Sequence, residues 1–133
     1  MEPLDLSRLP EQALILLDSA PIIYFLEDHP RFAPRFLPLF EQHSRGRVRF
    51  AVTTITIAEV LTGPLGVGDE SLVRRYRNIL ESWQVVAPDA EIAESAARVR
   101  ASFRLKLADA VQVASALAGN ADALVTHDRV GSG

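Results

Sequence analysis

The stretch Ala13–Leu17, ALILL, is a continuous apolar run that ends at an acid, Asp18. An apolar run of this length, bounded by a polar residue, is typical of a strand that is buried on both faces of a parallel sheet. It is far too short to cross a bilayer, so it predicts no membrane role. The fold is therefore expected to centre on a buried strand that has a carboxylate at its carboxyl end.

Similar apolar runs alternate with helical patterns along the rest of the chain. Val48–Val52, Trp83–Ala87 and Ala123–Thr126 predict three more strands. Strands that alternate with helices predict a three-layer α/β/α fold with a mainly parallel sheet. Helices are expected over residues 19–27, 31–43, 54–63, 69–80, 88–103 and 108–118.

Prolines and capping residues set the expected helix boundaries. Pro34 and Pro38 predict a broken or two-part helix in the second helical segment. Thr53 or Thr54 is expected to cap the third helix, which Gly63-Pro64 should stop.

The composition indicates one compact domain. The chain has 133 residues, of which 48% are hydrophobic and 23% charged, and it contains no cysteine. The lack of cysteine excludes a disulfide scaffold, zinc–cysteine sites and thiol catalysis. Residues 1–12 predict an N-terminal extension and no signal peptide, because they lack a basic region before an apolar run. We therefore expect a single cytoplasmic domain over 1–133, whose end at 130–133 is compatible with a natural end, a truncation or a cloning remnant.

Charged residues are nearly balanced, with 17 Asp and Glu against 14 Lys and Arg, which argues against a general nucleic-acid coat protein. Thirteen of the bases are arginine, whose planar fork suits phosphate. Composition alone favours an ordinary role for them on solvated helix faces. Most lie in three clusters: Arg45, Arg47 and Arg49; Arg74, Arg75 and Arg77; and Arg98, Arg100, Arg104 and Lys106.

Four acids occupy comparable places in this scheme. Asp18 ends the first strand, Glu59 lies in the helix after the second, Asp109 is in the first turn of the last helix, and Asp128 follows the fourth strand. The carboxyl ends of parallel strands form the crevice where ligands bind. Singly, Asp18 is explained as a helix cap, Asp109 as a first-turn acid and Asp128 as a turn residue. Glu59 is harder to explain in this way, because its neighbours are apolar.

Convergence of these acids would predict a metal site. Four carboxylates close together raise one another's pKa and oppose folding unless a cation holds them. Oxygen ligands without His or Cys suit Mg²⁺ or Mn²⁺.

Four stretches carry the acids: 16–20 (LLDSA), 54–64 (TITIAEVLTGP), 107–117 (LADAVQVASAL) and 121–129 (ADALVTHDR). In this order they resemble the motifs of PIN domains, especially those of VapC-type toxin ribonucleases. The resemblance implies that Asp18, Glu59, Asp109 and Asp128 form an acidic catalytic and metal-binding site, with Thr126 as a supporting hydroxyl.

Two positions depart from the family pattern. His127 stands where asparagine is common, and it is interpreted as a loop side chain rather than a catalytic base. After Asp128 the chain has Val130 and then Gly-Ser-Gly, where the family continues with an aromatic residue and a final strand. We therefore expect the fifth strand to be missing, which leaves a sheet edge bare or covered by a partner.

The resemblance implies a metal-dependent ribonuclease that is the toxin of a toxin–antitoxin pair. It implies RNA as substrate, an antitoxin whose tail lies in the active-site groove, and a homodimer. Without the four site acids, 13 Asp and Glu remain against 14 bases, so the overall charge does not argue against RNA. The residues 22–26 form an apolar face, which is interpreted either as core or as part of an interface.

Two other classes of protein are considered. A phospho-receiver domain also has an acidic Mg²⁺ pocket, but it needs paired acids after the first strand and a lysine after a late strand. Here Ser19 follows Asp18, and the only lysine, Lys106, precedes the last helix. A catalytically inactive PIN-like binding module is the more serious alternative, and the complete acidic set weighs against it.

Overall fold

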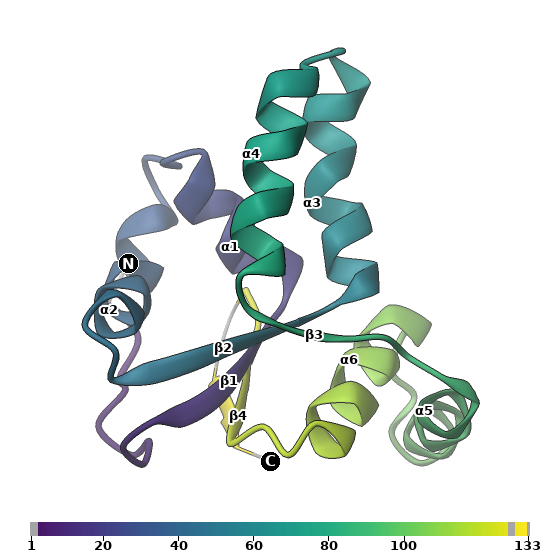
Figure 1. The fold of residues 1–133 in the computed structure, drawn as a ribbon. Helices are drawn as coiled ribbons and strands as arrows, with labels where there is room; N and C mark the ends of the chain where they lie inside the picture. Colours follow the sequence, from purple (N-terminus) through teal and green to yellow (C-terminus); the bar gives the residue numbers. More distant parts are fainter. Residues whose placement is uncertain (1–2, 128–129, 133) are drawn as a thin grey trace.

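The computed structural model describes residues 3–127 and 130–132. Within them, one sheet has the strand order β3-β2-β1-β4-β5. Its parallel part confirms the expected α/β fold and consists of β1 (Ala13–Leu17), β2 (Val48–Thr53), β3 (Gln84–Val86) and β4 (Ala123–Val125). Figure 1 shows β1 between β2 and β4.

A fifth strand, β5 (Val130–Ser132), pairs antiparallel with β4. The expectation that this strand is missing was therefore wrong. An antiparallel edge strand needs only backbone hydrogen bonds along one side, and three residues are enough to pair. The sequence Val-Gly-Ser has no alternating apolar pattern, so it did not indicate a strand.

Four helices in the described part of the chain begin at a side-chain cap. Asp18, Thr53, Asp69 and Asp89 each accept a backbone N–H at a helix start. The six helices of the described residues are α1 (Ser19–Leu26), α2 (Ala33–Ser44), α3 (Thr54–Gly66), α4 (Glu70–Glu81), α5 (Ala90–Phe103) and α6 (Leu107–Ala118).

Two helices continue through prolines that were expected to interrupt them. α2 is one continuous helix that contains Pro38, and α3 passes Pro64 and ends at Gly66. An interior proline removes one hydrogen bond, and the packing of neighbouring side chains can offset that loss. In α2 two residues close to Pro38, Phe36 and Leu39, are buried, and in α3 Pro64 is itself buried.

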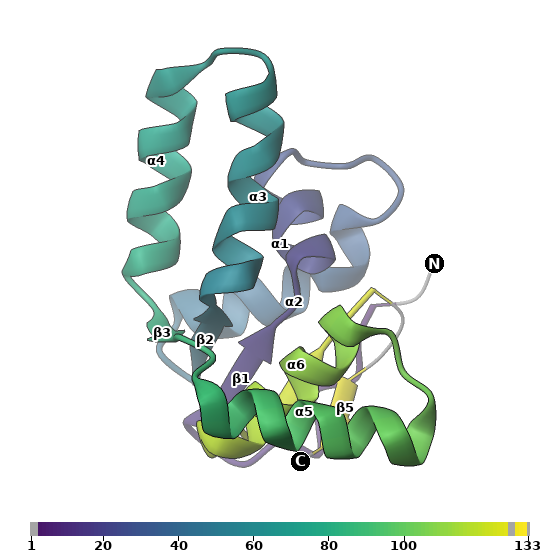
Figure 2. The same ribbon diagram turned by 90° about the vertical axis from the view of Figure 1, so that its right-hand side faces the viewer.

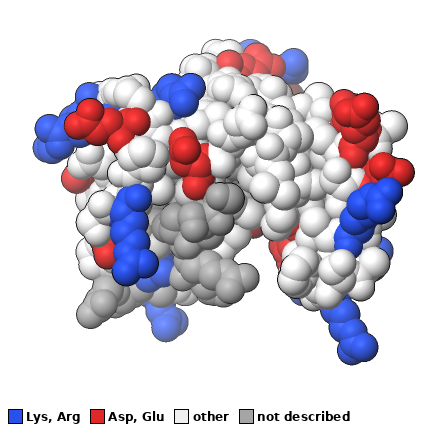
Figure 3. Space-filling model, turned by 90° about the horizontal axis from the view of Figure 1, so that it is seen from below, with Lys and Arg blue, Asp and Glu red and all other residues white. Residues whose placement is uncertain are grey.

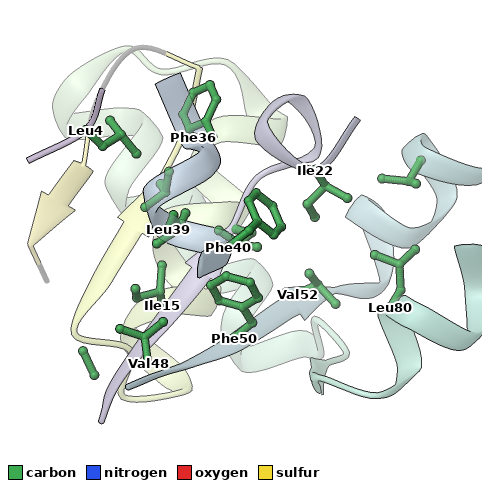
Figure 4. Packing of buried hydrophobic residues seen from close by; sticks show 14 of the residues in the cluster. Leu4, Ile15, Ile22, Phe36, Leu39, Phe40, Val48, Phe50, Val52 and Leu80 are labelled. Carbon is green, nitrogen blue, oxygen red and sulfur yellow. The ribbon is translucent and has the colours of Figure 1, made fainter. Parts of the chain in front are cut away.

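One face of the sheet packs against α1, α2, α3 and α4. Alternate residues of β1, including Ile15 and Leu17, share a core cluster with buried side chains of these helices. Figure 4 shows Phe40 of α2 above Phe50 of β2, with ring centroids 5.4 Å apart. This cluster is the main hydrophobic core of the described residues.

The opposite face packs against α6, with α5 outside it. Leu14 and Leu16 of β1 meet Ala116 of α6, and small residues of α6, such as Ala110, pack against Ala96 of α5. Figure 2 shows α5 and α6 together on this side, while α3 and α4 form a hairpin that extends beyond the sheet. The result is the expected three-layer arrangement.

The segment before β1 packs on the main core. Leu4 is buried, and its backbone N–H donates to the carbonyl oxygen of Arg35 at 3.0 Å. Most of the apolar face of α1 also contacts the core, and within residues 22–26 only Phe25 is exposed. No helix in the described part of the chain is long and apolar enough to span a membrane.

Candidate active site

Three of the four acids lie at the carboxyl edge of the parallel strands. Asp18 follows β1 and caps α1, Glu59 lies in α3 directly after β2, and Asp109 is in the first turn of α6. Figure 2 shows the first turns of these three helices around the ends of β1 and β2. The fourth acid, Asp128, lies outside the described residues.

The charges of the other two acids affect the ionisation of Glu59. Its pKa is raised above the ordinary value of 4.5, first by partial burial and then by the negative charge of Asp18. Asp109 raises the same pKa further, whereas a hydrogen bond with the Ser19 side chain lowers it. The carboxylates of Asp18 and Asp109 affect the pKa of Glu59 only if they lie near it, because Coulomb energy falls with distance. Acids from three separate elements therefore share one electrostatic environment.

The three carboxylates do not converge on a single point. Glu59 and Asp109 are exposed and Asp18 is half-buried. Over the ranges 3–127 and 130–132, no three Asp, Glu or His side chains lie close enough together to share one ion.

Asp18 is held more firmly than the other two acids. Its Oδ1 accepts the backbone N–H of Ser19 at 2.8 Å and the side-chain amide of Gln112 at 3.0 Å. Its own backbone N–H donates to the carbonyl oxygen of Val125 at 2.9 Å, which ties the end of β1 to the end of β4. The backbone and one carboxylate oxygen of Asp18 are thus fixed.

A buried polar cluster made of Thr53, Thr56 and Gln112 lies beneath Asp18. The Thr53 hydroxyl donates to Oε1 of Gln112 at 3.0 Å, and Nε2 of Gln112 donates to the Thr56 hydroxyl at 2.7 Å. All three residues are buried. The cluster joins β2, α3 and α6, which are the segments that lead to Glu59 and Asp109.

Sequence reasoning gave Thr53 or Thr54 as the helix cap but gave Gln112 no role. One signal was available, because Gln112 is the single long polar side chain in the otherwise small and apolar helix 107–118, apart from Asp109 near its start. A glutamine on a helix face that packs against a sheet must find hydrogen-bond partners there.

The residues after β4 pack against α1. Thr126 and His127 are half-buried, and the Tyr24 hydroxyl lies 2.9 Å from Nδ1 of His127. The His127 ring also contacts Phe32 edge-on, with centroids 4.9 Å apart. His127 is therefore held by aromatic neighbours, in keeping with its interpretation as a loop side chain.

A cavity of about 820 Å³ lies elsewhere, at the amino ends of β1 and β2. Gln12 and Val48 line it together with Arg45 and Arg47. It is at the opposite edge of the sheet from Asp18 and includes none of the expected site residues. The candidate site is thus the exposed acidic edge and not this cavity.

Charged side chains of both signs are interspersed on the surface. Figure 3 shows Lys and Arg beside Asp and Glu along two margins of one face. This face therefore carries no continuous patch of a single sign among the described residues. Any contact with phosphate there would be made by individual arginines.

Comparison with known proteins identifies the fold. The family model described as PIN domain matches residues 15–130. No protein with a curated description matches the chain.

Three solved structures are similar to the chain over most of its length. A chain in a toxin–antitoxin complex from Klebsiella pneumoniae is 26% identical, covers 84% of each chain and has a TM-score of 0.66. A chain of VapBC2 from Rickettsia felis, bound to a DNA fragment from its promoter, is 18% identical, with 85% of this chain and 86% of that chain covered and a TM-score of 0.64. A chain of VapBC-1 from nontypeable Haemophilus influenzae is 24% identical, with 86% of this chain and 87% of that chain covered and a TM-score of 0.66. Since the family model spans nearly the whole chain and the fold is similar to VapC toxins of VapBC complexes, the chain belongs to the PIN domain family.

Proposed function

We propose that the protein is a divalent-metal-dependent ribonuclease and the toxin of a toxin–antitoxin pair. Members of the PIN domain family are typically nucleases and generally depend on metal ions. The observation that carries the proposal is the placement of Asp18, Glu59 and Asp109 at one edge of the sheet, where the first and the last of these acids raise the pKa of Glu59. Such mutual repulsion at the ligand-binding edge of a sheet is what a cation would relieve.

The donor set fits Mg²⁺ or Mn²⁺. The three described acids offer carboxylate oxygens, which these hard cations prefer, and the chain has no cysteine. Asp18, Glu59, Asp109 and Asp128 would hold the ion, with the Thr126 hydroxyl in support. The carboxylates of the exposed Glu59 and Asp109 have room to move toward it.

Hydrolysis of a phosphodiester needs an activated water and neutralisation of the leaving oxygen, both of which a bound divalent ion supplies. The chain itself positions the carboxylates that would hold the ion. The backbone N–H of Ser19 and the amide of Gln112 hold Asp18, so this acid keeps a defined orientation. Exposed arginines at the rim would contact the phosphates of the RNA. No protein nucleophile is required.

Cleavage of RNA by the purified protein, free of any inhibitor, tests this proposal. Selected single-stranded and structured RNAs should be cut with Mg²⁺ or Mn²⁺, and a chelator should stop the reaction. Asp18→Asn should abolish cleavage, whereas Asp69→Asn, which makes the same charge change at the cap of α4, should leave it intact. Cleavage that survives both chelation and Asp18→Asn would identify a contaminant and end the proposal.

The proposed partners follow from the structural neighbours, which are toxin–antitoxin complexes. We expect an antitoxin tail that lies in the groove and places a basic side chain against the acids, and a homodimer as the basic unit. Native expression should then yield a small copurifying protein, and light scattering should give the mass of a dimer. A monomer at micromolar concentration with no copurifying protein would contradict the proposed antitoxin partner and the proposed homodimer.

A further inference from the structure

Gln112 makes more side-chain hydrogen bonds than its place in α6 requires. It is 3% exposed, and its amide reaches Asp18, Thr53 and Thr56, which lie on β1, β2 and α3 or directly beside them. Burial of an amide is favourable only when its donors and acceptor are paired. Here both N–H groups and the oxygen have partners.

Counting hydrogens fixes the orientation of this amide. The Thr53 Oγ1 accepts the backbone N–H of Thr56 at 3.1 Å, so its own hydrogen is free to point at Oε1 of Gln112. The alternative acceptor for that hydrogen, the Thr56 hydroxyl, is farther away, at 3.4 Å. A flipped amide would set its oxygen against Oδ1 of Asp18, which is an acceptor too. Nε2 of Gln112 must therefore face Asp18.

In this orientation the two oxygens of the Asp18 carboxylate have different roles. Oδ1 accepts two N–H donors, from Ser19 and from Gln112. Oδ2 has no hydrogen bond to any residue in the described ranges. Oδ1 is thus occupied by donors of the protein, and Oδ2 is left for a ligand at the acidic edge.

We propose that Gln112 is a positioning residue, which holds Asp18 so that Oδ1 is occupied and Oδ2 is presented to the cation. The inference rests on the proposed function, because it assigns a role within the same site. Gln112 also bridges to the start of α3, and it lies one turn after Asp109 in α6. The same buried amide therefore fixes the spacing between the segments that carry Asp18, Glu59 and Asp109.

Binding of Mn²⁺ alone, measured by calorimetric titration, tests the assignment without relying on activity. Gln112→Met keeps the length of the side chain and removes its hydrogen bonds. Loss of a partner that orients a metal ligand weakens metal affinity by about 10-fold or more. The same variant should need more Mn²⁺ for RNA cleavage, while KM for RNA at saturating Mn²⁺ stays near the parental value.

Matched variants separate positioning from general stability. Thr56→Val removes the hydroxyl that accepts from Gln112 and should weaken Mn²⁺ binding several-fold, whereas Thr56→Ser keeps the hydroxyl and should bind as the parent does. Ser115→Ala changes another buried polar residue of α6, whose Oγ has no hydrogen-bond partner within residues 3–127 and 130–132. It should leave Mn²⁺ affinity and cleavage unchanged. Thermal melts establish that each variant is folded.

The outcomes distinguish this inference from the proposed function. A folded Gln112→Met protein with parental Mn²⁺ affinity, beside a parent that cleaves RNA, would overturn the positioning role alone. A parent that binds Mn²⁺ in a Gln112-dependent way without cleaving RNA would end the ribonuclease proposal and support the positioning role. A parent that binds no Mn²⁺ would overturn both.

Discussion

Glu59 carries an energetic cost when its negative charge is not balanced by a cation. Partial burial opposes its ionisation first, and the carboxylates of Asp18 and Asp109 oppose it further. The folded chain therefore binds the Glu59 proton more tightly than the unfolded chain does. By linkage, stability is lost as the pH rises from 4.5, the ordinary pKa, through the higher folded pKa.

Glu59→Gln should remove this cost at neutral pH. In acid the Glu59 carboxyl is already neutral, so the substitution should have no such effect. With a chelator present, the variant is expected to melt at most a few degrees above the parent at pH 7. The difference should shrink as the pH falls and vanish below 4.5, where Glu59 is neutral in both states. Thermal melts of both proteins between pH 4 and 7 measure it. A difference that is the same at every pH would show that charge is not its cause.

Asp109 experiences two opposite effects. As a first-turn acid it is favoured by the partial positive charge of the α6 N-terminus, and as a neighbour of Glu59 it is disfavoured by repulsion. We expect repulsion to dominate, so that Asp109→Asn raises the melting temperature without metal by a few degrees. Added Mg²⁺ should stabilise the parent more than the variant.

Glu91 provides the matched control for this experiment. It occupies the first turn of α5, and it is not among the charges that act on Glu59. Glu91→Gln should therefore lower the melting temperature slightly or leave it unchanged. If Asp109→Asn behaves in the same way and responds to Mg²⁺ as the parent does, Asp109 is only a helix-start residue.

Among the elements, the sequence was most informative where one local rule decides the structure. β1 matches Ala13–Leu17 to the residue, because a buried run between polar boundaries has no competing interpretation. The cap of α3 was predicted at Thr53 or Thr54, and the structure shows Thr53. Local rules were insufficient at Pro38 and Pro64, where packing keeps the helices intact, and at β5, where pairing depends on the neighbouring strand.

The candidate site was predictable in part for the same reason. The carboxyl edge of a parallel sheet follows from topology, and this brought Asp18, Glu59 and Asp109 to one region. The side-chain orientation did not follow, because Gln112 reaches Asp18 across 94 positions of sequence. Helical spacing indicates which face of α6 is buried, but it does not indicate which polar groups meet there.

The start of α3 is the element most dependent on a single hydroxyl. Thr53 caps the helix by accepting the N–H of Thr56, and it also donates to Gln112. Thr53→Val keeps the shape and should cost about 1 kcal/mol for the lost cap and about 1 kcal/mol more for the buried amide oxygen left without a donor. Urea denaturation measures this loss, and Thr53→Ser should recover most of it. Equal stability of the valine and serine variants would contradict the role of the Thr53 hydroxyl as helix cap and as donor to Gln112.

For the whole molecule, the segment before β1 contributes to the main core. Leu4 is buried among core side chains, and Leu6 and Leu9 pack beside it. Leu4→Ala should destabilise the fold by roughly 2 kcal/mol or more, because it leaves a cavity in a packed cluster. Leu65→Ala, at a half-exposed position near the end of α3, should change stability by less than about 0.5 kcal/mol. Comparable losses for the two variants in urea denaturation would show that residues 4–9 are not held on the core.

The bridge from Gln112 to Asp18 has a consequence for the protein during its synthesis. Asp18 leaves the ribosome before α6 and β4, which hold it in place. Contacts between such distant parts of a chain form late in folding. A nascent chain that has not yet released α6 lacks Asp109 and the amide that orients Asp18. The acidic edge would therefore remain incomplete until α6 has been released and has packed beside Asp18.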